Sequence, residues 1–294
     1  MTGSVGIISA GDMGAAIGAI VASGGIDVAT NLTGRSELTR LRAAEAGIRD
    51  AGSTDALVEE CDLLLSVLPP ADAVGIAEEV AGAMARTGAR PTFAECNAIA
   101  PQTVVRIATL MLDTGAPYID AGIIGGPPGP GSEPRIYCSG PETSALESLR
   151  ECGLDIRRVG PRFGQASGLK MVYAASTKGT TAVWTEVLTA AEAMGLTDAL
   201  LAEFGDAADP ARHMKAATQM PRRAHRWVGE MEEIAATFEH LGLTPRILLG
   251  AADMFRFTGE TSLAEQTSRE PDPELREMLR VLAEQARGGQ APQS

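Results

Sequence analysis

Short apolar runs alternate with helix-like segments over the first 160 residues of the chain. Runs typical of buried strands occupy residues 5–8, 26–30, 62–68, 92–96, 118–121, 135–139 and 156–159. Segments with the helical spacing of apolar positions lie between them, at residues 15–23, 36–46, 71–86 and 101–114. Strands that alternate with helices are typical of βαβ units and predict a parallel, doubly wound sheet.

The pattern changes after Val159. Strand-like runs nearly disappear, and residues 167–194 have the pattern of one long helix that contains two glycines. Further helices are expected at residues 198–204, 210–220, 222–241, 245–255 and 272–287. We therefore predict an α/β Rossmann domain over residues 1–162 and an all-α domain over residues 163–294, in which residues 163–194 form an interdomain helix.

The segment from Ser9 to Gly14 follows the first predicted strand and opens the first predicted helix. It reads SAGDMG, which matches the dinucleotide fingerprint GxGxxG except for serine at the first position. In that fingerprint the first residue makes a tight turn, Gly11 lets a pyrophosphate approach the backbone, and Gly14 allows close packing of helix on strand. We predict that this segment, with Asp12 and Met13 in the turn, binds a dinucleotide at the helix N-terminus and that Ser9 makes the turn.

The end of the second predicted strand indicates which dinucleotide binds. NAD-binding domains carry an acidic residue there, about 20 residues after the glycine turn, which binds the ribose 2′-hydroxyl. The corresponding residues here are Gly34, Arg35 and Ser36, with no carboxylate among them. A guanidinium suits the geometry of a phosphate, and a serine hydroxyl can donate a hydrogen bond to it. We therefore predict that these residues bind the 2′-phosphate of NADP(H).

The charge balance narrows the range of partners. The chain of 294 residues carries a formal net charge of −13. Nucleic acids and anionic membranes bind to basic surfaces, so we expect neither as a partner. We expect a small-molecule substrate instead. The four cysteines lack the spacing of a zinc site, so we expect free thiols and no metal. No apolar stretch has the length of a membrane span, and we expect a cytoplasmic protein.

Four further segments follow the glycine turn in order along the chain. They are Leu68-Pro69, residues 97–101 (NAIAP), residues 120–126 (DAGIIGG) and residues 164–170 (GQASGLK). With these segments the sequence resembles the β-hydroxyacid dehydrogenase superfamily, which includes 3-hydroxyisobutyrate dehydrogenases, tartronate semialdehyde reductases and 6-phosphogluconate dehydrogenase. Residues 173–179 and 222–234 are more similar to a phosphogluconate-dehydrogenase-like branch of it. Imine reductases share this architecture.

The resemblance implies roles for residues on the cofactor side of the crevice. Leu68 and Pro69 match the segment that follows the family's third strand and are expected to contact the cofactor. Asn97 is expected to hydrogen-bond either to the substrate or to the nicotinamide amide. The interleaved helical domains of the family imply a homodimer.

The resemblance also implies a substrate pocket lined by Gly122, Ile124, Gly125 and Gly126. Backbone N–H groups of the last two glycines are expected to hold an oxyanion. Ile124 replaces a serine that helps to hold the substrate carboxylate in the family. The substrate is therefore expected to differ from a small 3-hydroxy acid.

Lysine is scarce in this chain, where only Lys170, Lys178 and Lys215 accompany the arginines. Lys170 matches the family's catalytic lysine, and the resemblance implies that it is the general acid and base for hydride transfer. The two asparagines that follow this lysine in the family are Tyr173 and Ala174 here. Tyr173 is expected on the same helix face as Lys170, where its hydroxyl binds substrate or assists proton transfer, or where its ring packs in the core. Lys178 is a candidate for binding an anionic substrate group or a second subunit.

The segment from Arg222 to Arg226 is basic and contains His225. It is expected to be either a solvated helix start or an anion contact that reaches the crevice of a partner subunit. Glu230 and the nearby glutamates are expected on a solvated face.

We therefore expect an NADP-dependent oxidoreductase that transfers a hydride between nicotinamide and a carbonyl or hydroxyl carbon of a small polar substrate. An imine or iminium reductase is an alternative, which Ile124, Tyr173 and Ala174 favour and Lys170 opposes. A non-catalytic NADP(H)-sensing protein is a third, and the presence of Lys170 argues against it.

Overall fold

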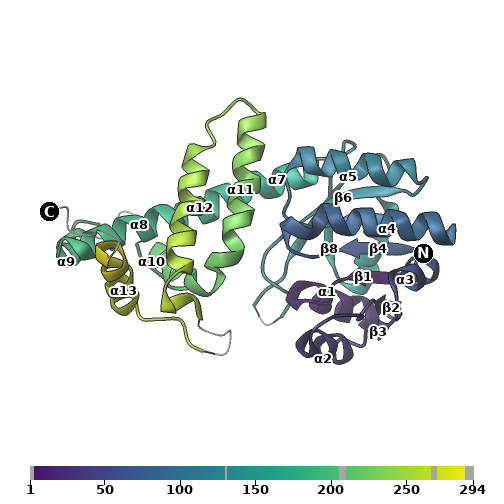
Figure 1. Ribbon diagram of the computed structural model, residues 1–294, viewed down its shortest axis with the longest axis horizontal. Helices are drawn as coiled ribbons and strands as arrows, with labels where there is room; N and C mark the ends of the chain where they lie inside the picture. The colour runs from purple at the N-terminus through teal and green to yellow at the C-terminus, as the bar shows by residue number, and fades with distance from the viewer. Residues whose placement is uncertain (1–2, 130, 205–209, 266–269, 289–294) are drawn as a thin grey trace. The chain divides into compact units, whose positions relative to one another are not determined.

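A computed structural model describes residues 3–129, 131–204, 210–265 and 270–288 (Figure 1). The chain divides into two compact units, Met1–Met171 and Val172–Ser294. The division falls inside one helix, α7 (Gln165–Ala174). No helix among the described residues is both long enough and apolar enough to cross a membrane.

The first unit is built around one sheet, which has eight strands within the described residues. In chain order they are β1 (Ser4–Ile8), β2 (Asp27–Thr30), β3 (Arg49–Asp50), β4 (Leu63–Ser66), β5 (Thr92–Glu95), β6 (Tyr118–Ile124), β7 (Arg135–Ser139) and β8 (Asp155–Gly160). Their order across the sheet is β3-β2-β1-β4-β5-β6-β7-β8. All neighbouring pairs are parallel except β6 and β7, which are antiparallel. This arrangement confirms the α/β Rossmann class.

Helices cover both faces of the sheet. The first unit contains α1 (Asp12–Ser23), α2 (Glu37–Glu45), α3 (Thr54–Glu60), η1 (Pro70–Asp72), α4 (Ala73–Thr87), α5 (Pro101–Asp113), α6 (Ser144–Glu147), η2 (Ser148–Cys152) and the start of α7. Residues of α1, α2, α6 and η2 share one core cluster with the sheet, and those of α3, α4 and α5 share the other. The central strands are buried on both faces, which explains why they read as continuous apolar runs instead of alternating ones.

The sequence pattern did not predict strand β3 or the short helices α3, α6 and η2, and one strand runs against the predicted direction. Strand β3 has two residues, both exposed, so it leaves no apolar run. Helix α3 is short, and it is signalled mainly by Ser53, whose hydroxyl accepts a hydrogen bond from the Ala56 N–H at 3.1 Å. Strand β7 follows β6 through a loop and no helix, so it returns antiparallel to β6.

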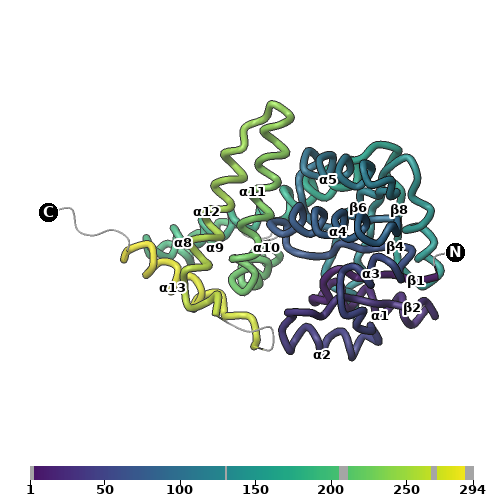
Figure 2. The backbone as a smooth tube through the Cα atoms, turned by 45° about the vertical axis from the view of Figure 1, so that its right-hand side comes forward, coloured from purple at the N-terminus to yellow at the C-terminus, as the bar shows by residue number. Residues whose placement is uncertain are grey.

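The second unit is helical over its described residues. It contains the end of α7, a π-helical segment η3 (Ala175–Gly179), α8 (Thr180–Ala193), α9 (Thr197–Phe204), α10 (Pro210–Thr218), η4 (Pro221–Arg223), α11 (Ala224–His240), α12 (Arg246–Gly259), η5 (Ser262–Glu265) and α13 (Leu275–Gly288). Helices α11 and α12 lie side by side and antiparallel (Figure 2). Apolar residues of α8, α10 and α13 form a second-unit core with those of η5.

The long helix predicted over residues 167–194 is helical throughout but is not a uniform α-helix. The π-helical segment interrupts it at Ala175–Gly179. The Ser176 hydroxyl donates to the Tyr173 carbonyl at 2.8 Å, and that of Thr177 donates to the same carbonyl at 3.3 Å. Such side-chain hydrogen bonds compete with the regular backbone hydrogen bonds of an α-helix. Segments of π-helix are frequent at functional sites.

Candidate cofactor and catalytic site

The glycine turn has the backbone geometry of the dinucleotide fingerprint. Ser9 has φ = 76° and is the one non-glycine residue with positive φ among those the structure describes. It therefore adopts the left-handed conformation that the first glycine normally supplies. A Cβ added to Gly14 would lie 2.3 Å from the Ser9 carbonyl oxygen, so only glycine fits there. This close contact is of the kind that the packing role predicted for Gly14 requires.

The N-terminus of α1 is arranged to receive an anion. Gly11 is the N-cap residue and supplies no side chain to the free N–H groups of the first turn. A Cβ added to Gly11 would meet nothing within 4 Å, so the backbone there is open to a ligand. The Asp12 carboxylate points to Arg42, at 2.5 Å, and Met13 packs against the core. An uncapped helix start beside open space fits the pyrophosphate of a dinucleotide.

The loop after β2 carries the predicted 2′-phosphate residues. Gly34 has φ = 70°, which favours glycine, and Arg35 is exposed. The Ser36 hydroxyl accepts a hydrogen bond from the Thr39 N–H at 3.3 Å and so caps helix α2. Arg35 lines two cavities, and Ser9 lines both as well. The larger cavity measures about 410 Å³ and also contains Leu68 and Pro69.

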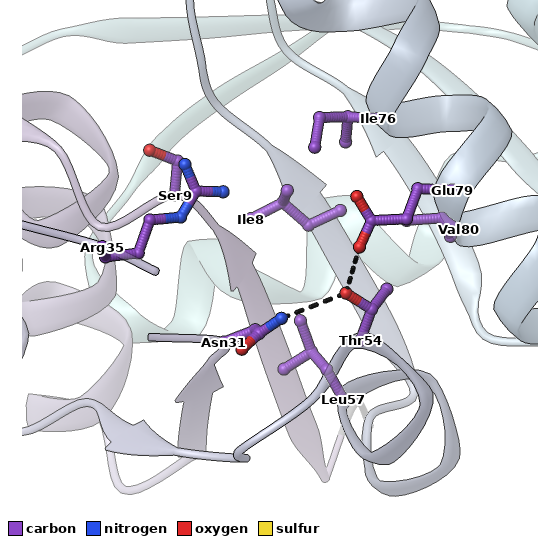
Figure 3. A pocket seen from close by; sticks show the side chains of 9 residues that line it. All are labelled: Ile8, Ser9, Asn31, Arg35, Thr54, Leu57, Ile76, Glu79 and Val80. Atoms are coloured by element: carbon purple, nitrogen blue, oxygen red, sulfur yellow. Dashed lines mark hydrogen bonds between the residues drawn. The ribbon is translucent and has the colours of Figure 1, made fainter. Parts of the chain in front are cut away.

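Three polar residues of the smaller cavity were not anticipated from the sequence (Figure 3). The Asn31 amide donates to the Thr54 hydroxyl at 3.1 Å, and that hydroxyl donates to the Glu79 carboxylate at 2.5 Å. They come from three separate elements, which are the end of β2, the start of α3 and the middle of α4. Asn31 was recognisable as the residue directly after the second strand, but its neighbours depended on the fold.

Asn97 is buried and holds the loop that contains Leu68. Its Oδ1 accepts from the Leu68 N–H at 2.6 Å, and its Nδ2 donates to the Ser66 hydroxyl at 2.9 Å. Asn97 is 3 % exposed. The geometry thus gives this residue a role in shaping the cofactor-side loop, and its predicted contact with substrate or nicotinamide remains a prediction.

Two buried carboxylates lie side by side in the sheet, Glu95 at the end of β5 and Asp120 within β6. Glu95 and Asp120 are paired in the strand register, and both are fully buried. The pKa of Glu95 is raised to about 8, mainly by burial and also by the nearby Asp120, while hydrogen bonds from Asn97 and Ser66 lower it. Burial also raises the pKa of Asp120, while hydrogen bonds from Ser167 and Ser139 lower it. The sequence showed Glu95 only as a polar residue near the end of an apolar run and Asp120 as the first residue of the segment DAGIIGG, and it did not indicate that the two meet.

Asp120 anchors the start of helix α7. Its carboxylate accepts hydrogen bonds from the Gly164 N–H at 2.8 Å, the Ala166 N–H at 3.1 Å and the Ser167 hydroxyl. The Ser139 hydroxyl donates to the same carboxylate at 2.7 Å. A carboxylate at a helix N-terminus satisfies free N–H groups and interacts favourably with the helix dipole. Asp120 therefore sets the position of the helix that carries Lys170.

Lys170 lies against the end of β6. Its Nζ donates a hydrogen bond to the Ile123 carbonyl at 2.5 Å, and the side chain is half-buried. A Cβ added to Gly122 would lie 3.0 Å from the Ala166 carbonyl and 3.1 Å from the Lys170 Cβ. Gly122 thus lets α7 approach the strand closely. Lys170 therefore lies beside the start of the segment of residues 122–126, and its catalytic role remains a prediction.

The other predicted substrate residues follow Gly122 along the chain. Ile124 is 4 % exposed, so its side chain belongs to the core. Gly125 has φ = 127° and lies so close to Pro134 that a Cβ would be 2.9 Å from its Cα. A Cβ on Gly126 would meet the Ser132 hydroxyl at 3.2 Å. Gly125 thus needs to be glycine for its backbone conformation and its packing, and the oxyanion role of the two glycines remains a prediction.

Lys178 and Glu230 form a buried ion pair in the helical unit. Their side chains are 13 % and 11 % exposed, and the Lys178 ammonium also lies 5.1 Å from the centre of the Trp227 ring. Burial lowers the pKa of Lys178, and Glu230 acts in the opposite direction. The expectation that Glu230 lies on a solvated face is wrong, because this glutamate neutralises a buried lysine of the π-helical segment.

The remaining candidates of the helical unit are more exposed. Tyr173 is 45 % exposed near the end of α7. Arg222 pairs with Asp272, and Arg226 lies 3.9 Å from Glu230. His225 is exposed. No group of three or more His, Cys, Asp and Glu side chains in the described ranges is arranged to hold a metal ion.

A mostly parallel sheet with a left-handed first turn, an open helix N-terminus and an adjoining cavity defines a dinucleotide-binding protein of the Rossmann class. The comparisons with known proteins extend this assignment. Residues 4–152 match the NAD binding domain of 6-phosphogluconate dehydrogenase, and residues 191–258 match a domain of unknown function, DUF1932. The chain belongs to the β-hydroxyacid dehydrogenase superfamily, and thereby to the NAD(P)-dependent dehydrogenases and reductases.

Individual relatives support the same assignment. An uncharacterized 28.5 kDa protein of Methanothermus fervidus is 28% identical over 176 residues, which are 60% of this chain and 66% of that protein. A solved structure of a conserved protein of unknown function, described as similar to 3-hydroxyacid dehydrogenases, is 27% identical. It matches 87% of this chain and 97% of its own with a TM-score of 0.66.

A more distant structure shares the fold. The reductive aminase from Aspergillus terreus, solved in complex with NADPH and ethyl levulinate, is 17% identical to this chain. The match covers 95% of this chain and 99% of that one, with a TM-score of 0.56.

Proposed function

We propose that this protein is an NADP(H)-dependent oxidoreductase that transfers a hydride between nicotinamide and a carbonyl or hydroxyl carbon of a small polar substrate. The observation that carries the proposal is the position of Lys170. Its half-buried Nζ lies at the end of β6, on an anchored helix of the dinucleotide-binding unit. The dinucleotide supplies or accepts the hydride when bound.

Lys170 handles the proton of this reaction. Reduction of a carbonyl leaves negative charge on oxygen, and a proton must reach that oxygen. The Lys170 ammonium donates it, and in oxidation the neutral amine takes it back. The hydrogen bond to the Ile123 carbonyl and the anchoring of α7 by Asp120 hold Nζ in one place. Preorganisation of this kind lowers the barrier because no reorientation is needed during the reaction.

The cofactor preference rests on Arg35. Arg35 and Ser9 line both cavities, and no acidic residue follows β2 directly. A 2′-phosphate there would pair with the guanidinium. Ser36 would add a hydrogen bond while it caps α2.

The substrate side is less suited to a carboxylate than in hydroxyacid dehydrogenases. Ile124 carries no hydrogen-bonding group where a serine is expected, so the backbone of Gly125 and Gly126 would hold the polar group of the substrate. Tyr173 and Lys178 are further candidates for substrate contacts. We further propose that the protein works as a cytoplasmic homodimer with interleaved helical domains.

An imine or iminium reductase is the second candidate. The apolar Ile124 favours it, because an imine substrate needs no carboxylate contact at this position. Lys170 would then donate its proton to nitrogen. A non-catalytic NADP(H) sensor is the third possibility, which the anchored lysine disfavours.

Turnover measurements with a lysine variant test the proposal. NADPH oxidation is followed with a panel of semialdehydes, keto acids and cyclic imines, and the class that is turned over decides between the first two candidates. Lys170→Ala should lower turnover by about 10²–10⁴-fold and leave the Kd for NADPH nearly unchanged. Lys215→Ala, at an exposed lysine of α10, is the matched control. Turnover in Lys170→Ala at the level of this control would refute the role of Lys170.

A further inference from the structure

The smaller cavity beside Arg35 has apolar walls and one polar end (Figure 3). Its walls are formed by Ile8, Leu57, Ile76 and Val80. The polar end is the hydrogen-bonded row of Asn31, Thr54 and Glu79. No comparison or motif assigns a role to this row, yet it faces the same cavity as the guanidinium predicted to select the cofactor.

The direction of each hydrogen bond in the row is determined by the backbone. The Asn31 Oδ1 accepts from the Thr33 N–H at 3.0 Å, so the amide NH₂ group must point to Thr54. The Thr54 hydroxyl accepts this hydrogen bond and therefore gives its own proton to Glu79. Glu79 is thus held as an acceptor, and a second carboxylate oxygen is left for other partners.

The cavity consequently combines one guanidinium with one carboxylate. A 2′-phosphate near Arg35 would be attracted by the guanidinium and repelled by Glu79. A 2′-hydroxyl carries no charge, is not repelled, and can donate to a carboxylate. We propose that Glu79 is a specificity-determining residue that opposes Arg35 and reduces the preference for NADPH over NADH. This inference rests on the proposed role of Arg35 as the 2′-phosphate ligand.

The size of the effect follows from Coulomb's law. For any carboxylate and phosphate dianion about 7 Å apart in a water-like dielectric, Coulomb's law gives a repulsion that weakens phosphate binding by about five- to tenfold, and we take this as the expected scale. Salt screens this repulsion, since both groups are near the surface. The two glutamates at this point of α4 differ in what they face. Glu78 pairs with Arg106 at 3.4 Å and does not line the cavity, so it provides a matched control.

Calorimetric binding of four nucleotides tests the inference. The probes are AMP, adenosine 2′,5′-bisphosphate, NADH and NADPH, which differ pairwise by the 2′-phosphate. Glu79→Gln should tighten the bisphosphate and NADPH by about five- to tenfold and leave AMP and NADH within about twofold. The gain should shrink in about 0.5 M salt. Glu78→Gln should change none of the four affinities.

The same titrations distinguish a failure of the role of Glu79 from a failure of the role of Arg35. The role of Glu79 would be overturned if Glu79→Gln changed the affinities for nucleotides with and without the 2′-phosphate equally. It would also be overturned if Glu79→Gln changed these affinities no more than Glu78→Gln does. The proposed role of Arg35 is tested separately with Arg35→Gln. If wild type binds AMP and the bisphosphate equally, and Arg35→Gln alters neither, the NADP assignment itself fails.

Discussion

Glu95→Gln should change how the stability of this protein depends on pH. Glu95 is fully buried at the end of β5. One carboxyl oxygen accepts from the Asn97 N–H at 2.8 Å, and the other has no partner among the described residues. Burial, with a further contribution from Asp120, raises its pKa from the ordinary value of 4.5 to about 8. Glutamine has the same shape as the protonated acid and does not titrate.

The sign and size of the effect follow from linkage. Between pH 4.5 and about 8 the folded protein holds a proton on Glu95 that the unfolded chain has lost, so the free energy of unfolding falls as pH rises. The stabilisation is fully present below pH 4.5 and is lost as pH rises through 8. Each pH unit is equivalent to about 1.4 kcal/mol, which limits the total loss to about 5 kcal/mol.

Urea unfolding between pH 5 and 8.5 measures this difference. The free energy of unfolding of wild type should fall with pH more steeply than that of Glu95→Gln, and the variant should gain by several kcal/mol at the alkaline end. Asp120 titrates in both proteins, and its interaction with Glu95 is part of the difference that the comparison measures. Glu78→Gln, at an exposed residue, should parallel wild type. Parallel curves for wild type and Glu95→Gln would refute the reasoning that Glu95 is protonated in the folded protein.

Three further substitutions test the site and the helical unit. Gly14→Ala places a Cβ 2.3 Å from the Ser9 carbonyl oxygen, so it should destabilise the protein by about 1–3 kcal/mol in thermal melts. It should also abolish the Tm increase caused by NADPH. An unchanged Tm increase would contradict the packing argument. Ser9→Gly relieves a left-handed serine and should stabilise by about 0.5–1 kcal/mol in urea unfolding, whereas a loss of stability would show that the hydroxyl outweighs the strain. Lys178→Met leaves Glu230 buried without this lysine, so it should lower the free energy of unfolding by about 3–5 kcal/mol. The double variant with Glu230→Gln should recover part of this loss. A double variant no more stable than Lys178→Met would argue against the ion pair.

Much of the fold was predictable from local pattern. Continuous apolar runs predicted the central strands, because a strand covered on both faces needs apolar residues on both sides. The segment from Ser9 to Gly14 predicted the cofactor turn, since the chemistry of a tight turn is confined to a few consecutive residues. The exposed, two-residue strand β3 and the antiparallel β7 left no such signal.

The tertiary structure decided which residues share a site. Asn31, Thr54 and Glu79 lie on three elements and meet in one cavity, and Glu95 meets Asp120 across the strand register. These contacts depend on strand order and helix packing.

Lys170 and Lys178 show the same difference between what the sequence predicts and what the tertiary structure decides. The motif order singled out Lys170, and the fold placed its amine on the Ile123 carbonyl. For Lys178 the sequence left several roles open, and only the packing of α11 against the π-helical segment supplied Glu230 as its partner. The sequence alone determined the elements and the cofactor turn, because these depend on neighbouring residues. Partners far apart in the chain were decided by the tertiary structure, because burial and charge pairing exist only after the elements have packed.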